Sequence, residues 1–447
     1  MPEVPAQEAR QSGSSAVVET VGMNVILAVL ALITGVTAAR LLGPESRGHL
    51  AAAQTVGTLV GALGSLALGE SLVYFVGRRS RPPRAALLSA VAFATVSMAF
   101  AFALAFVLMP LLLAGAPDAI TPARAYSLIG FTFVLVGFPI TFLRARERYR
   151  MWNLLRLIGP VSWLAALMWL ASSSGDSVTL LILLFVAGQA LCLPFVWRLA
   201  TRGTQEAKVD KSLLLPMLRY GTPLLLATLP ITFNIRLDQL FLANAESADQ
   251  LGLYAVSVSW AGLGLPLMAA IGSVLFPRLA SMDRSELPLV LARSSRAGVL
   301  IAGSIAVVSA LSAPVFVPFL FGGDFAVPVV LSVTLALATS LLGYNGLLEE
   351  GLRGAGEPRS VLLGESVGLA VTLILLFSLV PSLGIVGAAI ASLFGYASVT
   401  VTLIWTTRRQ VPISVRSLIV PTRTDVSVLR HHLALGVRAV RSRMRGK

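Results

Sequence analysis

An arginine and an aspartate lie two positions apart in an apolar part of the chain. Arg236 and Asp238 stand in RLDQLFLANAESADQLGLYAVSVSW, next to long hydrophobic runs. An ionised side chain at membrane depth costs roughly 2.5–3.5 kcal/mol on insertion scales, so it usually faces a cavity or a partner. Arg40 repeats the pattern near the N-terminus, where a short polar hairpin again follows the arginine. These residues predict a polar cavity inside a membrane-embedded bundle.

The composition is that of a helical membrane protein. The chain has 447 residues, of which 56% are hydrophobic and 13% are charged, whereas a soluble domain has about 25% charged residues. Its net charge of +14 is concentrated in alternate loops and in the C-terminal tail, which indicates orientation in a bilayer and argues against a nucleic-acid partner. Cys192 is the single cysteine, so a disulfide framework or a cysteine metal site within one chain is excluded.

The hydropathy pattern predicts about twelve transmembrane helices. The expected spans are about 16–39, 50–76, 85–113, 123–143, 153–172, 178–199, 217–243, 250–276, 297–320, 327–348, 361–380 and 384–406. Basic residues follow the even-numbered spans, and the intervening loops are mostly short and neutral or acidic. Basic loops stay in the cytoplasm, so both termini are expected inside, in the cytoplasmic membrane of a bacterium. Pro223 and Pro230 predict a bend in the seventh span.

The two halves of the chain resemble each other at an offset of a little over 200 residues. ARLLGPESRG from Ala39 matches the stretch from Arg236 in kind, with Gly48 or Gly252 after the polar hairpin. Six spans per half predict two parallel six-helix bundles, 16–199 and 217–406, with pseudo-twofold symmetry and a site at their interface. The remaining parts are a disordered N-terminus at 1–15, a cytoplasmic linker at 200–216 and a basic tail at 407–447. From Asp425 the tail predicts an amphipathic helix that binds anionic inner-leaflet lipid, or a solvated tail that only enforces topology.

Five motifs in this order resemble a known family. They are RLLGPESRG at 40–48, RLDQLFLA with LGLYAVSVSW at 236–260, FPRLA at 276–280, LRGAGEPRS at 352–360 and GIVGAAIASLFGY at 384–396. The chain is similar to the multidrug/oligosaccharidyl-lipid/polysaccharide exporter superfamily, and within it to the polysaccharide-biosynthesis or O-antigen-type flippases. The resemblance implies two six-helix bundles around a central cavity. It also implies a polyprenyl-linked sugar, or a related lipid-linked precursor, that alternating access moves between the leaflets.

Such a substrate has an acidic head, for which arginine is the natural partner because its planar fork binds two oxygens. Arg236 is the first candidate, oriented by Asp238; an internal ion pair is the competing interpretation. Arg40 is the second candidate, and the competing interpretation is that it anchors the helix at the membrane interface. Asn234 and Asn345 are candidates for hydrogen bonds to sugar, although polar residues also join helices.

Charged residues near the cytoplasmic ends of spans predict a gate or an ion site. Glu70 is expected to bind a proton or sodium, or to pair with Arg78 or Arg79. Glu349, Glu350 and Arg353 form the second group, in which at least one glutamate is expected in a solvated loop. Glu365, at the start of the next span, is expected at the membrane interface.

No motif for catalysis, a metal or a cofactor is found, and there is no G-x-x-x-x-G-K-[ST] phosphate loop. Together with the function that the resemblance implies, this makes a lipid-linked oligosaccharide flippase without enzymatic activity the leading hypothesis. A cation-coupled multidrug exporter of the same superfamily remains open. So does a membrane glycosyltransferase, a polymerase or a scaffold for polysaccharide-assembly glycosyltransferases, although the short external loops argue against a polymerase.

Overall fold

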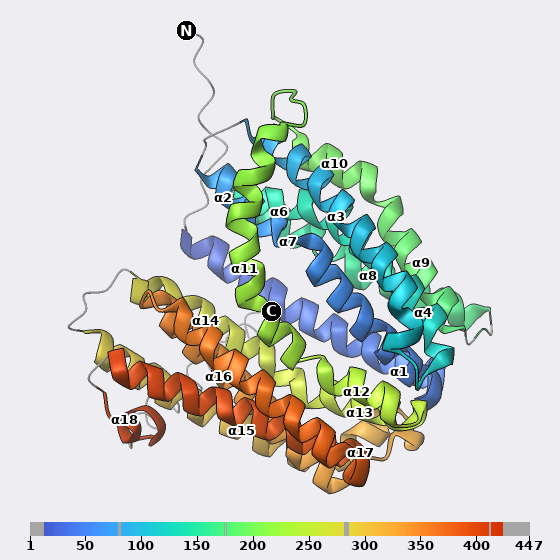
Figure 1. Cartoon of the computed structure of the whole chain (residues 1–447), viewed down its shortest axis with the longest axis vertical. Coiled ribbons are helices and arrows are strands. Elements are labelled where there is room, and N and C mark those ends of the chain that lie inside the picture. Colours follow the sequence, from blue (N-terminus) through green and yellow to red (C-terminus); the bar gives the residue numbers. More distant parts are fainter. Residues whose placement is uncertain are drawn as a thin grey trace, which may run out of the picture. The chain divides into compact units, whose positions relative to one another are not determined.

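The structure is a computed structural model that describes residues 13–78, 82–173, 175, 177–280, 286–410 and 413–422. Every regular element in these residues is helical (Figure 1). Ten helical segments are long and apolar enough to cross a membrane. Two of them, α1 (Gly13–Ser65) and α17 (Pro358–Gln410), have 53 residues each and are broken into two helices by one non-helical glycine. The described residues therefore contain the twelve predicted spans of a multi-pass membrane protein.

The break in α1 is at Gly43 (φ 71°, ψ 175°), and that in α17 is at Gly384 (φ 55°, ψ −133°). Glycine adopts such positive φ values without the steric cost that a Cβ atom brings. Pro44 then begins the second helix of α1, where its missing N–H costs nothing. The polar hairpin expected after Arg40 is thus helical apart from Gly43.

The chain forms two compact units, residues 1–259 with 317–326 and residues 260–316 with 327–447, called unit 1 and unit 2 below. The division expected at 200–216 remains a prediction, since packing groups the following helices up to residue 259 with unit 1. The N-terminal segment 1–12 and the tail from 423, where an amphipathic helix is predicted, lie outside the described residues.

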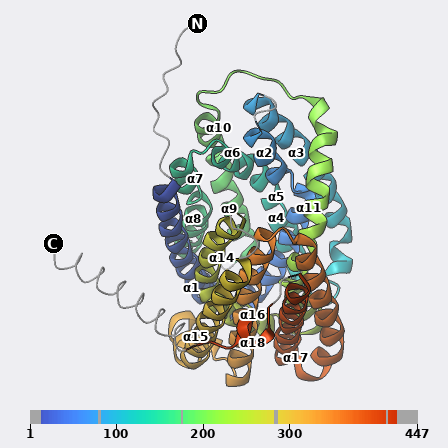
Figure 2. The same ribbon diagram turned by 90° about the vertical axis from the view of Figure 1, so that its left-hand side faces the viewer.

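Unit 1 contains the longer series of helices. They are α1, α2 (Leu68–Gly77), α3 (Pro83–Leu112), η1 (Pro117–Ala119), α4 (Ile120–Ser127), α5 (Ile129–Thr132), the π-helical η2 (Phe133–Gly137), α6 (Phe138–Ala145), α7 (Tyr149–Leu155), α8 (Ile158–Ser172), α9 (Val178–Leu191), α10 (Leu193–Thr201), η3 (Lys211–Leu213), α11 (Leu214–Asn234), α12 (Leu237–Ala245), most of α13 (Ala248–Ala261) and η5 (Gly323–Phe325). Figure 2 shows α2, α3 and α11 side by side. Their core includes Leu72, Leu87, Met98, Phe138 and Phe142, all buried. The outer face of α3 instead exposes Phe100, Val107 and Leu111, as expected for a surface in contact with lipid.

Two glycines fix the crossing of α1 and α13 in unit 1. A Cβ atom at Gly48 would collide with the backbone of Ala248, and one at Gly252 would collide with the backbone of Pro44. The two glycines that mark the sequence repeat therefore meet at one crossing, where each leaves room for the other helix. Small residues permit such close backbone approach between membrane helices.

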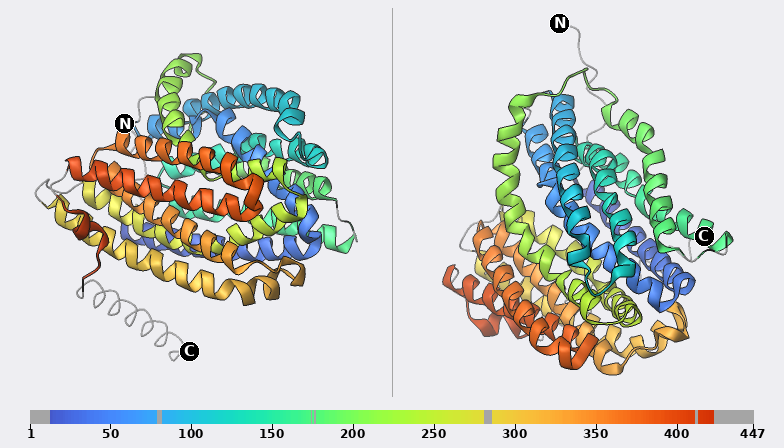
Figure 3. Two further views of the ribbon diagram at one scale, coloured as in Figure 1. Left: turned by 60° about the horizontal axis from the view of Figure 1, so that its bottom comes forward. Right: turned by 45° about the vertical axis from the view of Figure 1, so that its right-hand side comes forward.

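Unit 2 consists of η4 (Gly262–Gly264), α14 (Leu265–Ala280), most of α15 (Leu287–Phe321), α16 (Val329–Gly354), α17 and the short α18 (Val415–Ile419). Helix α16 packs against both α14 and α17 (Figure 3). Its core includes Met268, Tyr344, Leu347, Val399 and Leu403. The start of the tail is fixed on α15, because Ser295 donates a hydrogen bond of 2.8 Å to the Leu418 carbonyl.

Candidate functional site

Arg236 occupies a break in the seventh span. Helix α11 ends at Asn234 and α12 begins at Leu237, and Arg236 between them has φ −122° and ψ −21°. The predicted bend is therefore present, but it lies downstream of Pro223 and Pro230, which are both inside α11. The break holds Arg236 half-buried in unit 1.

A second arginine, Arg47 of α1, lies near Arg236. Arg47, Arg236 and Tyr126 of α4 are within electrostatic reach of one another. The Tyr126 hydroxyl also hydrogen-bonds with the side chain of Gln54. Gln54 lies on the same face of α1 as Arg47, seven positions further along the helix. Three elements that are far apart in the chain thus bring two guanidinium groups and a phenol together.

Arg47 is buried, with 9% of its surface exposed. Its Nη1 atom has no hydrogen-bond partner in the part of the chain that the structure describes, and no carboxylate is among the groups that act on it. A buried charge without a partner is costly, so buried charges are normally paired or hydrogen-bonded. The geometry therefore leaves the Arg47 and Arg236 pair, called the arginine pair below, suited to a bound anion.

Asp238 accepts hydrogen bonds that hold α12 in place next to this site. Its Oδ2 atom accepts a 2.7 Å hydrogen bond from the Tyr254 hydroxyl, and its Oδ1 accepts one of 2.7 Å from the Gln239 N–H. Thr55 of α1 donates to the Gln239 side chain at 3.2 Å. The expected role of Asp238 in orienting Arg236 remains a prediction. Asp238 links α12 to α13, which fixes the helix that follows Arg236.

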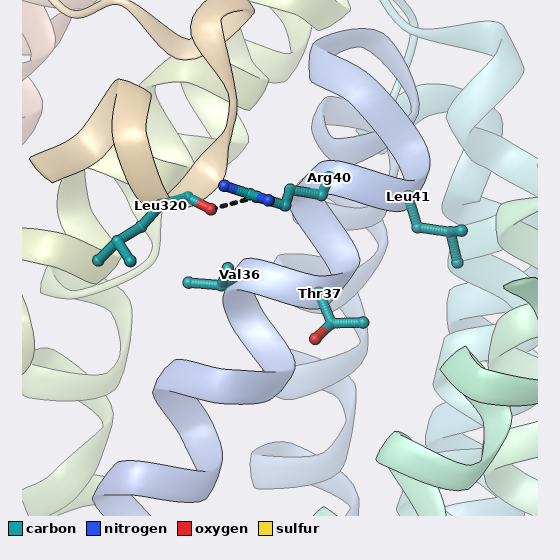
Figure 4. Close-up of a pocket in the computed structure, with 5 residues that line it drawn as sticks. All are labelled: Val36, Thr37, Arg40, Leu41 and Leu320. Atoms are coloured by element: carbon teal, nitrogen blue, oxygen red, sulfur yellow. Dashed lines mark hydrogen bonds between the residues drawn. The ribbon is translucent and has the colours of Figure 1, made fainter.

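Arg40 lies at the end of the first span, and its side chain hydrogen-bonds to the C-terminal end of α15 (Figure 4). Its Nε atom donates to the Leu320 carbonyl, and its Nη2 to the Phe319 carbonyl, both at 2.6 Å. The last carbonyls of a helix lack intrahelical donors, and a cation there is favourable. An open pocket of about 530 Å³ lies beside it, lined by Val36, Thr37, Arg40, Leu41 and Leu320. Arg40 is thus a helix cap on an exposed pocket, and it is not part of the arginine pair.

The ion pair of Glu70 differs from the one expected. Arg144 of α6 donates from Nη2 to both carboxylate oxygens of Glu70 at 3.1 Å. Arg78 lies over the ring of Tyr74 at 4.8 Å, and Tyr74 stacks on Tyr220 of α11. The partner of Glu70 in the structure is thus Arg144 and not Arg78. The alternative partner, Arg79, lies outside the described residues, so the predicted gate remains a prediction.

A double-mutant cycle on Glu70 and Arg144 tests whether this pair stabilises the fold. Both side chains are partly exposed, Glu70 by 55% and Arg144 by 34%. Exposed ion pairs typically contribute about 0.2–1 kcal/mol. We expect Glu70→Gln and Arg144→Gln to have a coupling energy in this range, measured by thermal or denaturant unfolding in detergent. A much larger coupling energy would contradict the interpretation as a solvent-screened pair.

Unit 2 contains the second group of predicted charged residues. Arg353 donates to Glu349 Oε2 at 3.0 Å and to Glu350 Oε1 at 2.8 Å. Glu350 is partly exposed, whereas Glu349 is buried. Glu365 of α17 is also buried, with 1% exposed, and its expected position at the membrane interface remains a prediction.

The two asparagine candidates are buried. Asn345, with 0% exposed, donates to the Tyr396 carbonyl at 2.9 Å and accepts from Thr400 at 2.6 Å. It therefore joins α16 to α17 and does not line a cavity. Asn234, with 1% exposed, lies at the end of α11 beside the break at Arg236. Within the described residues, no group of three or more His, Cys, Asp or Glu side chains is placed to hold a metal ion.

A family model described as "Polysaccharide biosynthesis protein" matches residues 38–344, more than half of the chain. The chain belongs to this polysaccharide biosynthesis protein family. The matched region includes the arginine pair, Tyr126 and Asp238, and it ends before Glu349. No curated protein matches this family member in sequence.

Solved structures show which fold the family member has. The lipid II flippase MurJ in an inward closed conformation is similar over 89% of this chain and 88% of its own, with a TM-score of 0.75 and 12% identity. An inward-facing MATE multidrug resistance transporter of the MOP superfamily is similar over 88% and 98%, with a TM-score of 0.66 and 15% identity. The MATE multidrug transporter DinF-BH is similar over 94% and 100%, with a TM-score of 0.65 and 14% identity. The predicted fold class, the all-helical fold of this exporter superfamily, is confirmed.

Sequence reasoning missed Arg47 and Tyr126 as members of the site. Arg47 stands among polar residues in GPESRG, which suggested a loop. The signal that could have found it is helical spacing. Pro44 can begin a helix, and from there Arg47 and Gln54 are seven positions apart, on one helix face.

Proposed function

We propose that this protein is a flippase that moves a lipid-linked oligosaccharide, or a related polysaccharide precursor, across the bacterial cytoplasmic membrane by alternating access. Family membership and the exporter-superfamily fold support the general class, a membrane transporter in polysaccharide synthesis. The observation that carries the substrate class is the buried Nη1 of Arg47, which lacks a partner among the described residues beside a second arginine.

A polyprenyl-linked sugar has an acidic pyrophosphate, many hydroxyls and a long apolar tail. Its head cannot cross hydrocarbon bare, because its charges and hydrogen-bonding groups would be left unsatisfied. Two guanidinium forks can each bind a pair of phosphate oxygens. The arginine pair would hold the head, while the tail stays in lipid.

The driving force follows from the same charge. An anion that leaves an inside-negative cell gains about 2.3 kcal/mol per elementary charge per 100 mV. We also propose that both termini are cytoplasmic, that the basic tail binds anionic lipid, and that glycosyltransferases of polysaccharide assembly are partners. The protein itself would carry out no covalent chemistry.

Reconstitution tests the proposal directly. Full-length protein in proteoliposomes should move a fluorescent polyprenyl-pyrophosphate sugar between leaflets, read as a change in the fraction that a membrane-impermeant quencher reaches. The matched control is a polyprenyl sugar with a neutral linkage, which should not be moved.

Equal movement of the neutral and charged lipids would contradict a role for the arginine pair in recognition. Transport of a lipophilic cation without transport of the lipid-linked sugar would favour the multidrug exporter instead. Lengthened glycan products would favour a polymerase.

A further inference from the structure

Two buried glutamates on neighbouring helices of unit 2 meet side chain to side chain. Glu349 of α16 and Glu365 of α17 are each 1% exposed. Their side chains are within hydrogen-bonding reach of each other. Both positions lie beyond the region that the family model matches. Neither residue belongs to the arginine pair.

The hydrogen bonds available to Glu349 do not satisfy it as a carboxylate. Arg353 binds its Oε2 atom but divides its two Nη groups between Glu349 and Glu350. The Oε1 atom of Glu349 is buried and accepts from no donor in the described part of the chain. A carboxylate oxygen that faces a second carboxyl group gains a hydrogen bond only if one of the two carries a proton.

The described charged groups that act on Glu349 supply it with little compensating charge. The charged groups that act on Glu349 are Glu365, Arg353 and Glu350. The described side chains of α14, residues 265–272 and Leu275, are all uncharged. On α15, Arg296 donates to the Ser417 carbonyl and Arg293 is exposed. On α17, Arg359, Arg408 and Arg409 are exposed. Among the described charged groups that act on Glu349, two are acids and one is a base, and two adjacent carboxylates cannot both ionise at low cost.

We propose that Glu349 and Glu365 form a proton-binding site, in which one proton is held between the two carboxyl groups. The side chains beside the site, Arg353 and Glu350, are 36% and 35% exposed, and this is the side from which we expect a proton to enter. Loss of the proton places two anions between α16 and α17, and their repulsion loosens this packing. A coupling of that change to substrate movement rests on the proposed function; the proton site itself does not.

Infrared spectroscopy of the full-length protein in lipid nanodiscs tests this site without a transport assay. We expect the C=O stretch of about one protonated carboxyl per chain at pH 7, as for a pair that shares a proton. The band should shift when glutamate is isotope-labelled. It should be absent in Glu349→Gln and Glu365→Gln, since one remaining carboxylate can accept from the new amide. Glu350→Gln, a carboxyl on the same arginine, is the matched control and should keep the band.

The absence of a protonated glutamate band from the wild-type protein at pH 7 would overturn the proposal, and that measurement needs no variant. Persistence of the band in the Glu349→Gln/Glu365→Gln double variant would overturn it as well. Loss of the band when sodium replaces a bulky organic cation at constant pH would overturn it in favour of a metal-cation site. Failure of the flippase assay leaves these spectra unchanged, so the two proposals can fail separately.

Discussion

Arg47→Ala is expected to reduce transport of the pyrophosphate-linked lipid by about ten- to a hundredfold while folded protein still reaches the membrane. Hydrogen bonds to charged groups contribute about 1.5–3 kcal/mol, and each 1.4 kcal/mol is a factor of ten. The fold should tolerate the change, because Nη1 of Arg47 has no partner to lose in the described residues. Removal of a buried cation beside Arg236 also removes a repulsion. The measurement is the leaflet-exchange rate in proteoliposomes of equal protein content.

Three further variants show whether transport depends on the positive charge of the arginine pair, on the planar guanidinium group, or on any arginine in this region. Arg47→Lys keeps the charge but loses the planar fork, so we expect an intermediate rate. Arg236→Ala should resemble Arg47→Ala. Arg40→Ala is the matched control, since Arg40 caps the carbonyls of Phe319 and Leu320 and should affect stability more than transport. Wild-type transport by Arg47→Ala and Arg236→Ala would remove the arginine pair from the mechanism.

Gly252→Val is expected to prevent folding of unit 1. Its Cβ would collide with the backbone of Pro44, which cannot rotate away as a side chain can. Overpacking typically costs about 1–3 kcal/mol even where side chains can adjust, so a collision with backbone should cost at least that. The measurement is the fraction of monodisperse protein after detergent extraction, together with its thermal midpoint.

Two other glycines complete this experiment. Gly48→Val should have a similar effect, because its Cβ would meet the backbone of Ala248 at the same crossing. Gly61→Ala, also on α1, is the control: a Cβ there meets nothing within 4 Å. Normal yield and stability of Gly252→Val would show that the crossing is looser than the structure indicates.

Most of the fold could be predicted because it follows from local properties of the sequence. Apolar runs about as long as the hydrocarbon layer is thick become spans wherever they occur. Both glycine breaks lie at predicted boundaries between spans: Gly43 is between the first and second spans, and Gly384 begins the twelfth. The weakest local prediction was the hairpin after Arg40: polar residues suggested a loop, but Pro44 and the residues after it are helical.

The site was less predictable, because partners are chosen by packing between distant helices. Glu70 had basic residues eight and nine positions away, yet it pairs with Arg144 from another span. The hydrogen bond from Tyr254 to Asp238 was not predicted, because it joins two helices. Arg236 itself could be predicted because an ionised side chain in an apolar run has a high free-energy cost. Arg47, its neighbour in space, gave no such signal because it lies among other polar residues.

The single-residue breaks at Gly43 and Gly384 bear on how the protein is made. Each joins two spans with no intervening loop that could pass through the membrane separately. We therefore expect both spans of α1 to enter the membrane together, as a helical hairpin, and likewise those of α17. Biogenesis of this chain should proceed in pairs at these two places, with the first helix waiting for the second before it enters lipid.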